Sequence, residues 1–240
     1  MPLSAYDWLL ARRTFLLSVA LGGLVFAVMV GTDDPASTHA GRAGRFAGLV
    51  SLAGGAAAFI AIEQARSRGE MRAIGAAGVR PAKAALGAVL GGAAFGALGP
   101  AMIFVRGVDI GPLFPRGPTS SAEWVAQGRE WVDVAHGVAV RVGGELVRTS
   151  ASVPSVVAPL PIPRFATAMA LGIAAIAFPL WATARGAPLR RSAVVLVVAA
   201  ATVAAFHLVA ADHVPAGALV VPPMLLALDA IALHRGSSWS

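Results

Sequence analysis

Residues 63–83 read EQARSRGEMRAIGAAGVRPAK, a polar and arginine-rich stretch between two long apolar runs. Its charged residues are Glu63, Arg66, Arg68, Glu70, Arg72, Arg80 and Lys83. Gly78 and Pro81 are typical of a helix end, so the pattern predicts a short helix at about residues 64–80. On charge alone the stretch also fits a solvated cytoplasmic loop. Its length and its helix-forming centre favour a helix on which a partner protein docks.

The composition is that of an integral membrane protein. Of the 240 residues, 57% are hydrophobic and 13% are charged, and the mean hydropathy is +0.75. These values lie outside the range of ordinary soluble domains. The formal net charge is +7, but no basic face with interleaved aromatic residues indicates nucleic-acid binding. Because the chain has no cysteine, disulfides, thiolate metal sites and thiol nucleophiles are excluded.

A helix needs ~20 residues to cross a hydrocarbon layer ~30 Å thick, and six apolar segments have a similar length. Backbone polar groups must be satisfied inside lipid, so the segments are predicted to be helices. They are Thr14–Val30, Phe46–Ile62, Ala82–Val105, Phe165–Ala184, Ser192–Ala211 and Val214–Leu233. The expected fold is an all-α membrane protein of six transmembrane helices, three in residues 1–105 and three in residues 165–240, with an insertion at 106–164.

The basic residues predict that both termini are cytoplasmic. With the N-terminus inside, 11 of the 19 Lys and Arg residues fall on the cytoplasmic side and 8 outside. Most of the outer ones belong to the long segment 106–164, and long segments weigh little in the positive-inside rule. The cytoplasmic set is Arg12, Arg13, Arg66, Arg68, Arg72, Arg80, Lys83, Arg185, Arg190, Arg191 and Arg235.

The insertion at 106–164 is expected to be a small extracytoplasmic α+β module. A capping-box pattern predicts a short helix at about 121–130. Alternating valines from 132 to 142 and the glycine pair at 143–144 predict a β-hairpin. An isolated hairpin is marginally stable, so the module is expected to pack on the membrane part or on a partner.

Small and basic residues at the membrane segments suggest two further roles. The third segment contains the small-xxx-small pairs Gly87/Gly91 and Gly92/Gly96. Such pairs let helix backbones approach closely, so helix packing is expected there. Arg42 and Arg45 precede the second segment at its outer end, where anionic lipid headgroups are candidate ligands; ordinary anchoring is the simpler interpretation.

The segment SRGEMRAIGAAGVRP (residues 67–81) resembles the coupling segment of the LptF/LptG (YjgP/YjgQ) permeases, which follows their second membrane helix. The matching residues are Ser67, Glu70, Met71, Ile74, Ala76, Ala77, Gly78 and Val79. Further similar positions are Tyr6 with Arg12-Arg13, Gly99-Pro100, and Val214-Pro215 with Pro222-Pro223. The MacB/FtsX permeases carry a similar coupling stretch, but their four-helix layout fits this chain less well.

The resemblance implies the permease subunit of a lipid-exporting ABC transporter in a bacterial inner membrane. Its partners would be a separate ATPase dimer, a second permease copy or paralogue, and a membrane lipid as substrate. The residues that would couple it to the ATPase are Glu70, Arg66, Arg68, Arg72, Ile74 and Gly78. The chain has no Gly-x-x-x-x-Gly-Lys-Ser/Thr motif, and no catalytic residue, cofactor or metal is expected in it. The family's large jellyroll cannot fit in residues 106–164, so the substrate and a periplasmic bridge stay open.

Two other functions stay open from the sequence. A membrane-embedded lipid-modifying enzyme would need polar groups that converge in the bilayer, and the candidates are His207, Asp229 and Glu63. No spacing among them matches a metal site or a Ser/His/Asp triad. A non-transporting scaffold that holds a partner in the membrane would also fit the short outer segment.

Overall fold

The computed structural model of the chain describes residues 4–33, 38–114, 124–127, 130–133, 138–141, 144, 146–148, 163–184 and 188–236. These residues form two compact units. The larger unit comprises Met1–Pro115 with Pro163–Ser240, and the smaller unit comprises Arg116–Ile162.

The larger unit is helical over most of each long apolar run predicted from the sequence. Its elements are α1 (Ala5–Thr32), α2 (His39–Ser67), α3 (Glu70–Ala76), α4 (Pro81–Ala84), α5 (Leu86–Gly96), α6 (Leu98–Ile103), η1 (Gly111–Leu113), α7 (Arg164–Thr183), α8 (Pro188–Ala210), η2 (Ala216–Val220) and α9 (Val221–Gly236). Among the described residues, five segments are long and apolar enough to cross a membrane: Ala5–Thr32, His39–Ser67, Leu86–Ile103, Arg164–Thr183 and Ala216–Arg235. The sixth predicted segment coincides with α8, in which the apolar stretch Val197–Ala210 is shorter.

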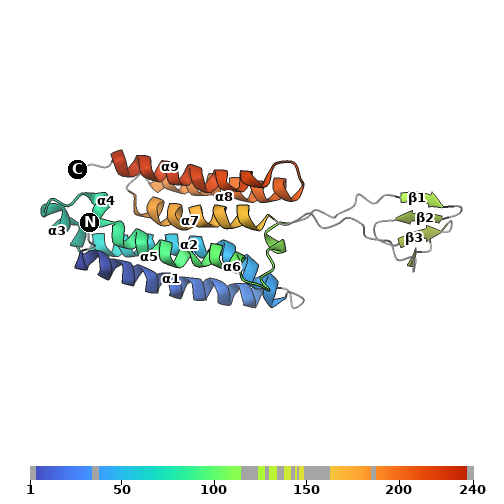
Figure 1. The fold of residues 1–240 in the computed structure, drawn as a ribbon, viewed down its shortest axis with the longest axis horizontal. Helices are drawn as coiled ribbons and strands as arrows, with labels where there is room; N and C mark the ends of the chain where they lie inside the picture. Colours follow the sequence, from blue (N-terminus) through green and yellow to red (C-terminus); the bar gives the residue numbers. More distant parts are fainter. Residues whose placement is uncertain are drawn as a thin grey trace. The chain divides into compact units, whose positions relative to one another are not determined.

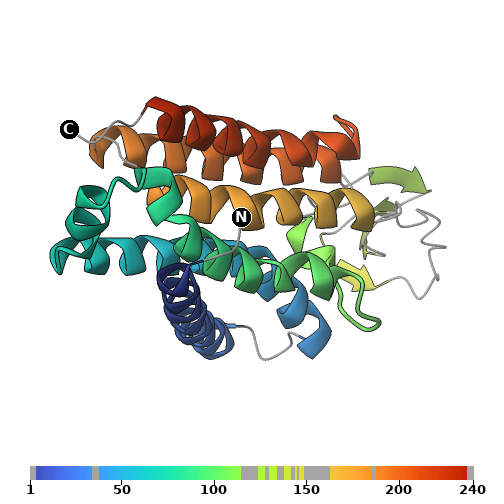
Figure 2. The same ribbon diagram turned by 60° about the vertical axis from the view of Figure 1, so that its left-hand side comes forward.

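The helices of the larger unit pack around α2, α5 and α7. Helix α2 contacts α1, α5 and α7, while α7 also contacts α5 and α9. Figure 1 and Figure 2 show α7 between the α2–α5 pair and the α8–α9 pair. Most of the buried residues of α2 are Ala or Gly, and small side chains let neighbouring backbones come close.

Local sequence signals account for where α1 and α9 begin. Ser4 caps α1, because its hydroxyl accepts from the backbone N–H of Asp7 at 3.1 Å while the Asp7 carboxylate accepts from the Ser4 N–H at 2.9 Å. Such a capping box satisfies two orphan donors of the first turn. The residues Pro222-Pro223 fall in the first turn of α9, where proline is tolerated because its missing N–H has no intrahelical partner.

The smaller unit contains a four-stranded antiparallel sheet in the order β1-β2-β3-β4. Its strands are β1 (Trp124–Gln127), β2 (Glu130–Asp133), β3 (Val138–Arg141) and β4 (Leu146–Arg148). Trp131 pairs with Ala126 of β1 and with Val140 of β3. The predicted glycine turn lies between β3 and β4, and Gly144 has a φ of 82° there.

Two predictions for this unit need correction. The helix predicted at about 121–130 is wrong for residues 124–127, which form β1. The single alternating run predicted from 132 to 142 is two strands, because β2 and β3 pair antiparallel with Val132 opposite Ala139. A capping box is a local signal, whereas Trp and Val at 124 and 125 favour a strand, and cross-strand pairing then decides the conformation. The capping-box residues themselves lie outside the described residues.

Candidate functional site

The segment that joins α2 to α5 is divided by two glycines. Helix α2 continues to Ser67, Gly69 has a φ of 76°, and α3 then runs only from Glu70 to Ala76. A second glycine, Gly78, has a φ of 78°. Because glycine adopts this left-handed conformation without steric cost, each glycine ends a helix. The helix predicted at 64–80 is therefore the end of α2 followed by a separate two-turn helix. We call residues 68–83 the connector.

One face of the connector packs into the larger unit. Met71 is 4% exposed and belongs to a buried cluster with residues of α1, α2, α4 and α5 and with Ala85 between the last two: Leu10, Ala58, Ala61, Ile62, Ala65, Ala84 and Ala88. Ile74 and Val79 are partly buried against the same cluster. The apolar residue predicted to anchor a partner, Ile74, thus contacts the chain's own core.

The carboxylate of Glu70 also contacts this chain. The phenolic O–H of Tyr6 in α1 donates to Oε2 of Glu70 at 3.3 Å, and Nη1 of Arg68 lies 3.9 Å from Oε1. The Glu70 side chain is 33% exposed. Glu70 therefore links the connector to α1, and its remaining exposed part shares the surface with Arg68.

The outer face of the connector is cationic. Arg72, Arg80 and Lys83 are exposed, and the Arg68 side chain is 62% exposed. In the part of the chain that the structure describes, no acid forms an ion pair with Arg72, Arg80 or Lys83. The connector thus presents a positively charged outer face on an apolar inner face. Both views place α3 at one extreme end of the helical unit (Figures 1 and 2).

Arg66, which precedes the connector, contacts both its own helix and α7. Its Nη1 forms an ion pair with Glu63, and its Nη2 donates to the backbone carbonyl of Thr183 at 3.4 Å. Nearby, Arg13 of α1 donates to the side chain of Gln64. The last turns of α2 are therefore tied to α1 on one side and to α7 on the other.

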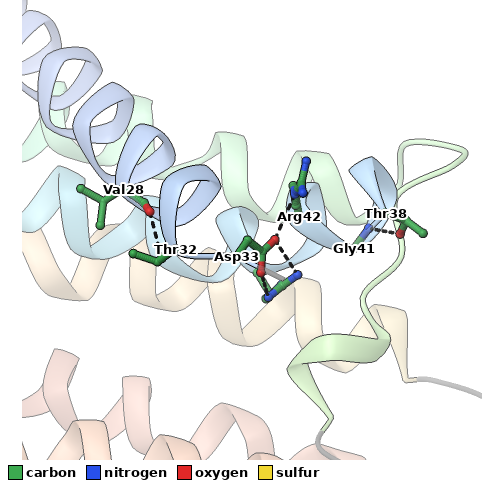
Figure 3. Close-up of polar contacts among 7 residues, drawn as sticks. Val28, Thr32, Asp33, Thr38, Gly41 and Arg42 are labelled. Carbon is green, nitrogen blue, oxygen red and sulfur yellow. Dashed lines mark hydrogen bonds and ion pairs between the residues drawn. The ribbon is translucent and has the colours of Figure 1, made fainter. Parts of the chain in front are cut away.

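At the opposite end of α2, Arg42 and Arg45 form ion pairs with Asp33; Figure 3 shows Asp33 beside Arg42. Nε of Arg42 lies 3.0 Å from Oδ2 of Asp33, and Arg45 donates from Nη2 to Oδ2 at 2.9 Å and from Nη1 to Oδ1 at 2.5 Å. Asp33 follows the last residue of α1, and its side chain is only 5% exposed. The two arginines that were candidates for binding lipid headgroups thus pair with Asp33 and join the end of α1 to the start of α2.

The glycines of α5 lie at its contacts with three helices. A Cβ on Gly87 or Gly91 would overlap a backbone carbonyl of α1, at Asp7 or Ala11. A Cβ on Gly92 would lie 2.6 Å from the Gly54 carbonyl oxygen of α2, and one on Gly96 would lie 2.9 Å from Cβ of Ala175 in α7. The two small-xxx-small pairs therefore face different neighbours.

The structure does not bring the candidate catalytic groups together. Glu63 pairs with Arg66 at the end of α2, while Oδ2 of Asp229 accepts from Trp181 Nε1 at 3.1 Å. His207 is exposed one turn before the end of α8. Among the described residues, no group of three His, Asp or Glu side chains could hold a metal ion.

Two partners at these sites were not identified from the sequence. Tyr6 is the only tyrosine, and a tyrosine hydroxyl usually has a hydrogen-bond partner when it is buried. Asp33 is an acid at the end of an apolar run, with arginines 9 and 12 residues later, a pattern that could have indicated the ion pairs.

Comparison with protein-family models, curated proteins and solved structures finds no match.

Proposed function

We propose that the chain is the membrane-spanning permease subunit of an ABC transporter that moves a lipid or another amphiphile. The connector would be the element on which a separate ATPase docks. One observation carries this proposal: the connector has an exposed cationic outer face, while its inner face is fixed to α1 by Glu70 and to the core by Met71. A partner that moved the connector would therefore also move the helices beneath it.

We infer a topology of six membrane helices with both termini in the cytoplasm. Helix α8 has 23 residues and so a length of ~35 Å, which is enough to cross a ~30 Å layer. The first turn of α1, the connector and the last turn of α9 lie at one end of the larger unit in Figure 1, as an even number of crossings requires. In this topology the insertion between α6 and α7 lies outside the cytoplasm.

The contacts of the connector residues support different roles for them than the resemblance implied. Glu70 and Ile74 contact α1 and the core, so we infer that they transmit motion. Arg72, Arg80 and Lys83 are exposed, so they are the residues that would recognise the partner, through an acidic groove. The resemblance of residues 67–81 to the coupling segment of the LptF/LptG permeases supports the ATPase as that partner.

A transporter of this kind needs more helices than one chain supplies. Helix α1 leaves large apolar side chains exposed along its length, among them Trp8, Leu9, Leu16, Leu24 and Val28. A face of this kind fits lipid or another membrane helix. We propose a second permease copy or a paralogue as the neighbour, with the amphiphile moving between the two.

Purification of the tagged chain from its native membrane tests the proposal. The wild-type complex is expected to contain an ABC ATPase and to hydrolyse ATP. The double variant Arg72→Glu/Arg80→Glu is expected to lose both, whereas Arg235→Glu, which alters an exposed cation at the same end, should retain them. Binding of the ATPase to the connector should weaken as the salt concentration rises from 0.1 to 1 M, because the Debye length falls from about 10 Å to about 3 Å. A wild-type chain that is isolated without any ATPase would contradict the proposal and favour the scaffold.

A further inference from the structure

The C-terminal turn of α7 is capped only in part by its own residues: the Thr183 hydroxyl donates to the Leu180 carbonyl at 2.9 Å, and the Ala184 N–H donates to the Trp181 carbonyl at 3.2 Å. The last carbonyl groups of any helix have no intrahelical partner. A basic side chain in the last turn often supplies hydrogen bonds and a favourable charge there, but α7 has none in its last turn. The turn ends at Thr183, which is buried, so water access to these carbonyls is restricted.

Side chains from two other helices occupy these carbonyls. Nη2 of Arg66 in α2 donates to the Thr183 carbonyl at 3.4 Å. Nε2 of His234 in α9 lies 3.0 Å from the Leu180 carbonyl oxygen and 3.4 Å from Oγ1 of Thr183. A carbonyl oxygen can only accept, so Nε2 of His234 carries the proton in this arrangement. The end of α7 is thus capped from both sides by residues distant in sequence.

The Arg66 cap adjoins the connector. Arg66 lies two residues before Arg68, where α2 ends and the connector begins. Another polar contact between α2 and α7 joins Ser51 Oγ to the Leu171 carbonyl at 3.4 Å, about four turns earlier along α2. At the connector end of α2, Arg66 therefore links α2, and with it the helices packed on α2, to α7.

We propose that Arg66 and His234 are positioning residues, which pass a displacement of the connector to α7 and α9 through their shared cap. The inference rests on the proposed function, because it names the path by which the docking site would reach the second half of the chain. When the connector moves, Arg66 moves with the end of α2, the hydrogen bond to Thr183 changes, and the environment of His234 changes in turn.

The path can be tested in the chain alone by ¹⁵N NMR of histidine-labelled protein in detergent. The Nε2 resonance of His234 is assigned by its loss in His234→Gln. Glu70→Ala, which removes the tie between the connector and α1, is expected to shift this resonance. In an Arg66→Gln background the same change should produce no shift, whereas an Arg72→Gln background should preserve it. The proposal would be overturned if Glu70→Ala left the His234 Nε2 chemical shift unchanged, or if it changed that shift equally in all backgrounds.

A second variant separates the cap from the ion pair of Arg66 with Glu63. Arg66→Lys keeps the positive charge beside Glu63, but a single ammonium lacks the fork of the guanidinium that serves two acceptors. We expect Arg66→Lys to retain the fold, as judged by thermal unfolding, and to lose the shift as Arg66→Gln does. Retention of the full shift would contradict a role for the cap. Because no ATPase takes part, the result is independent of whether the docking proposal holds.

Discussion

The phenolic oxygen of Tyr6 lies 3.3 Å from Oε2 of Glu70, although 64 residues separate them in the sequence. This hydrogen bond joins the first turn of α1 to the first turn of α3. It directs the one acid of the connector toward the chain itself and leaves the cations outside. The exposed outer face of the connector is therefore cationic, although Glu70 was among the residues expected to meet a partner.

Tyr6→Phe is expected to loosen the connector. Hydrogen bonds to charged groups contribute about 1.5–3 kcal/mol, and the partial exposure of Glu70 reduces this, so we expect a loss of about 1 kcal/mol in the free energy of unfolding. Denaturant unfolding in detergent measures it. Arg72→Gln, an exposed change on the same element, should stay within about 0.5 kcal/mol. Equal stability of Tyr6→Phe and wild type would show that the bond contributes nothing.

Asp33→Ala is expected to destabilise the α1–α2 connection strongly. The substitution leaves Arg42 and Arg45 without the carboxylate that both contact. Breaking a fully buried pair costs about 3–5 kcal/mol. Because the Arg45 side chain is 34% exposed, we expect about 2–3 kcal/mol. In the background of Arg42→Gln/Arg45→Gln the same substitution should cost much less, and a double-mutant cycle on unfolding free energies checks this coupling.

Gly91→Ala is expected to separate α5 from α1. The added methyl group would overlap the carbonyl oxygen of Ala11, and a forced backbone shift costs about 1–3 kcal/mol. The matched control is Gly172→Ala in α7, where a Cβ meets nothing within 4 Å. That change should be stabilising by about 0.5–1 kcal/mol, because alanine favours the helix over glycine. Thermal unfolding of the two variants should therefore move in opposite directions.

The sequence predicts the long helices well because a membrane-length apolar run has few alternative conformations. It also predicts a helix in residues 64–80, but not the break at Gly69, since one glycine inside a polar stretch is compatible with either a helix or a turn. The inward-facing side of α3 is the side that carries Met71, because Met71 packs into a cluster of residues from four other elements. That choice is a property of tertiary packing.

Long-range polar partners are the part of the site that local patterns miss. Arg66 reads as a cytoplasmic cation from the sequence, and only the position of α7 shows that it caps Thr183. The same holds for Asp229, whose position inside an apolar run suggested catalysis, whereas its carboxylate accepts a hydrogen bond from buried Trp181. Both contacts depend on where helices pack, which hydropathy does not encode.

The proposed topology predicts which residues can be labelled from each side of the membrane. The chain has no cysteine, so single cysteines can be introduced at exposed positions without a background signal. In intact cells, Arg72→Cys and Arg235→Cys should react only with membrane-permeant maleimides, whereas Asp109→Cys and His213→Cys should also react with impermeant ones. The crucial pair is His213→Cys and Arg235→Cys, because they flank the α9 span and report whether α8 has crossed before it. If His213→Cys were protected like Arg72→Cys, α8 would not cross the membrane and the six-helix topology would be wrong.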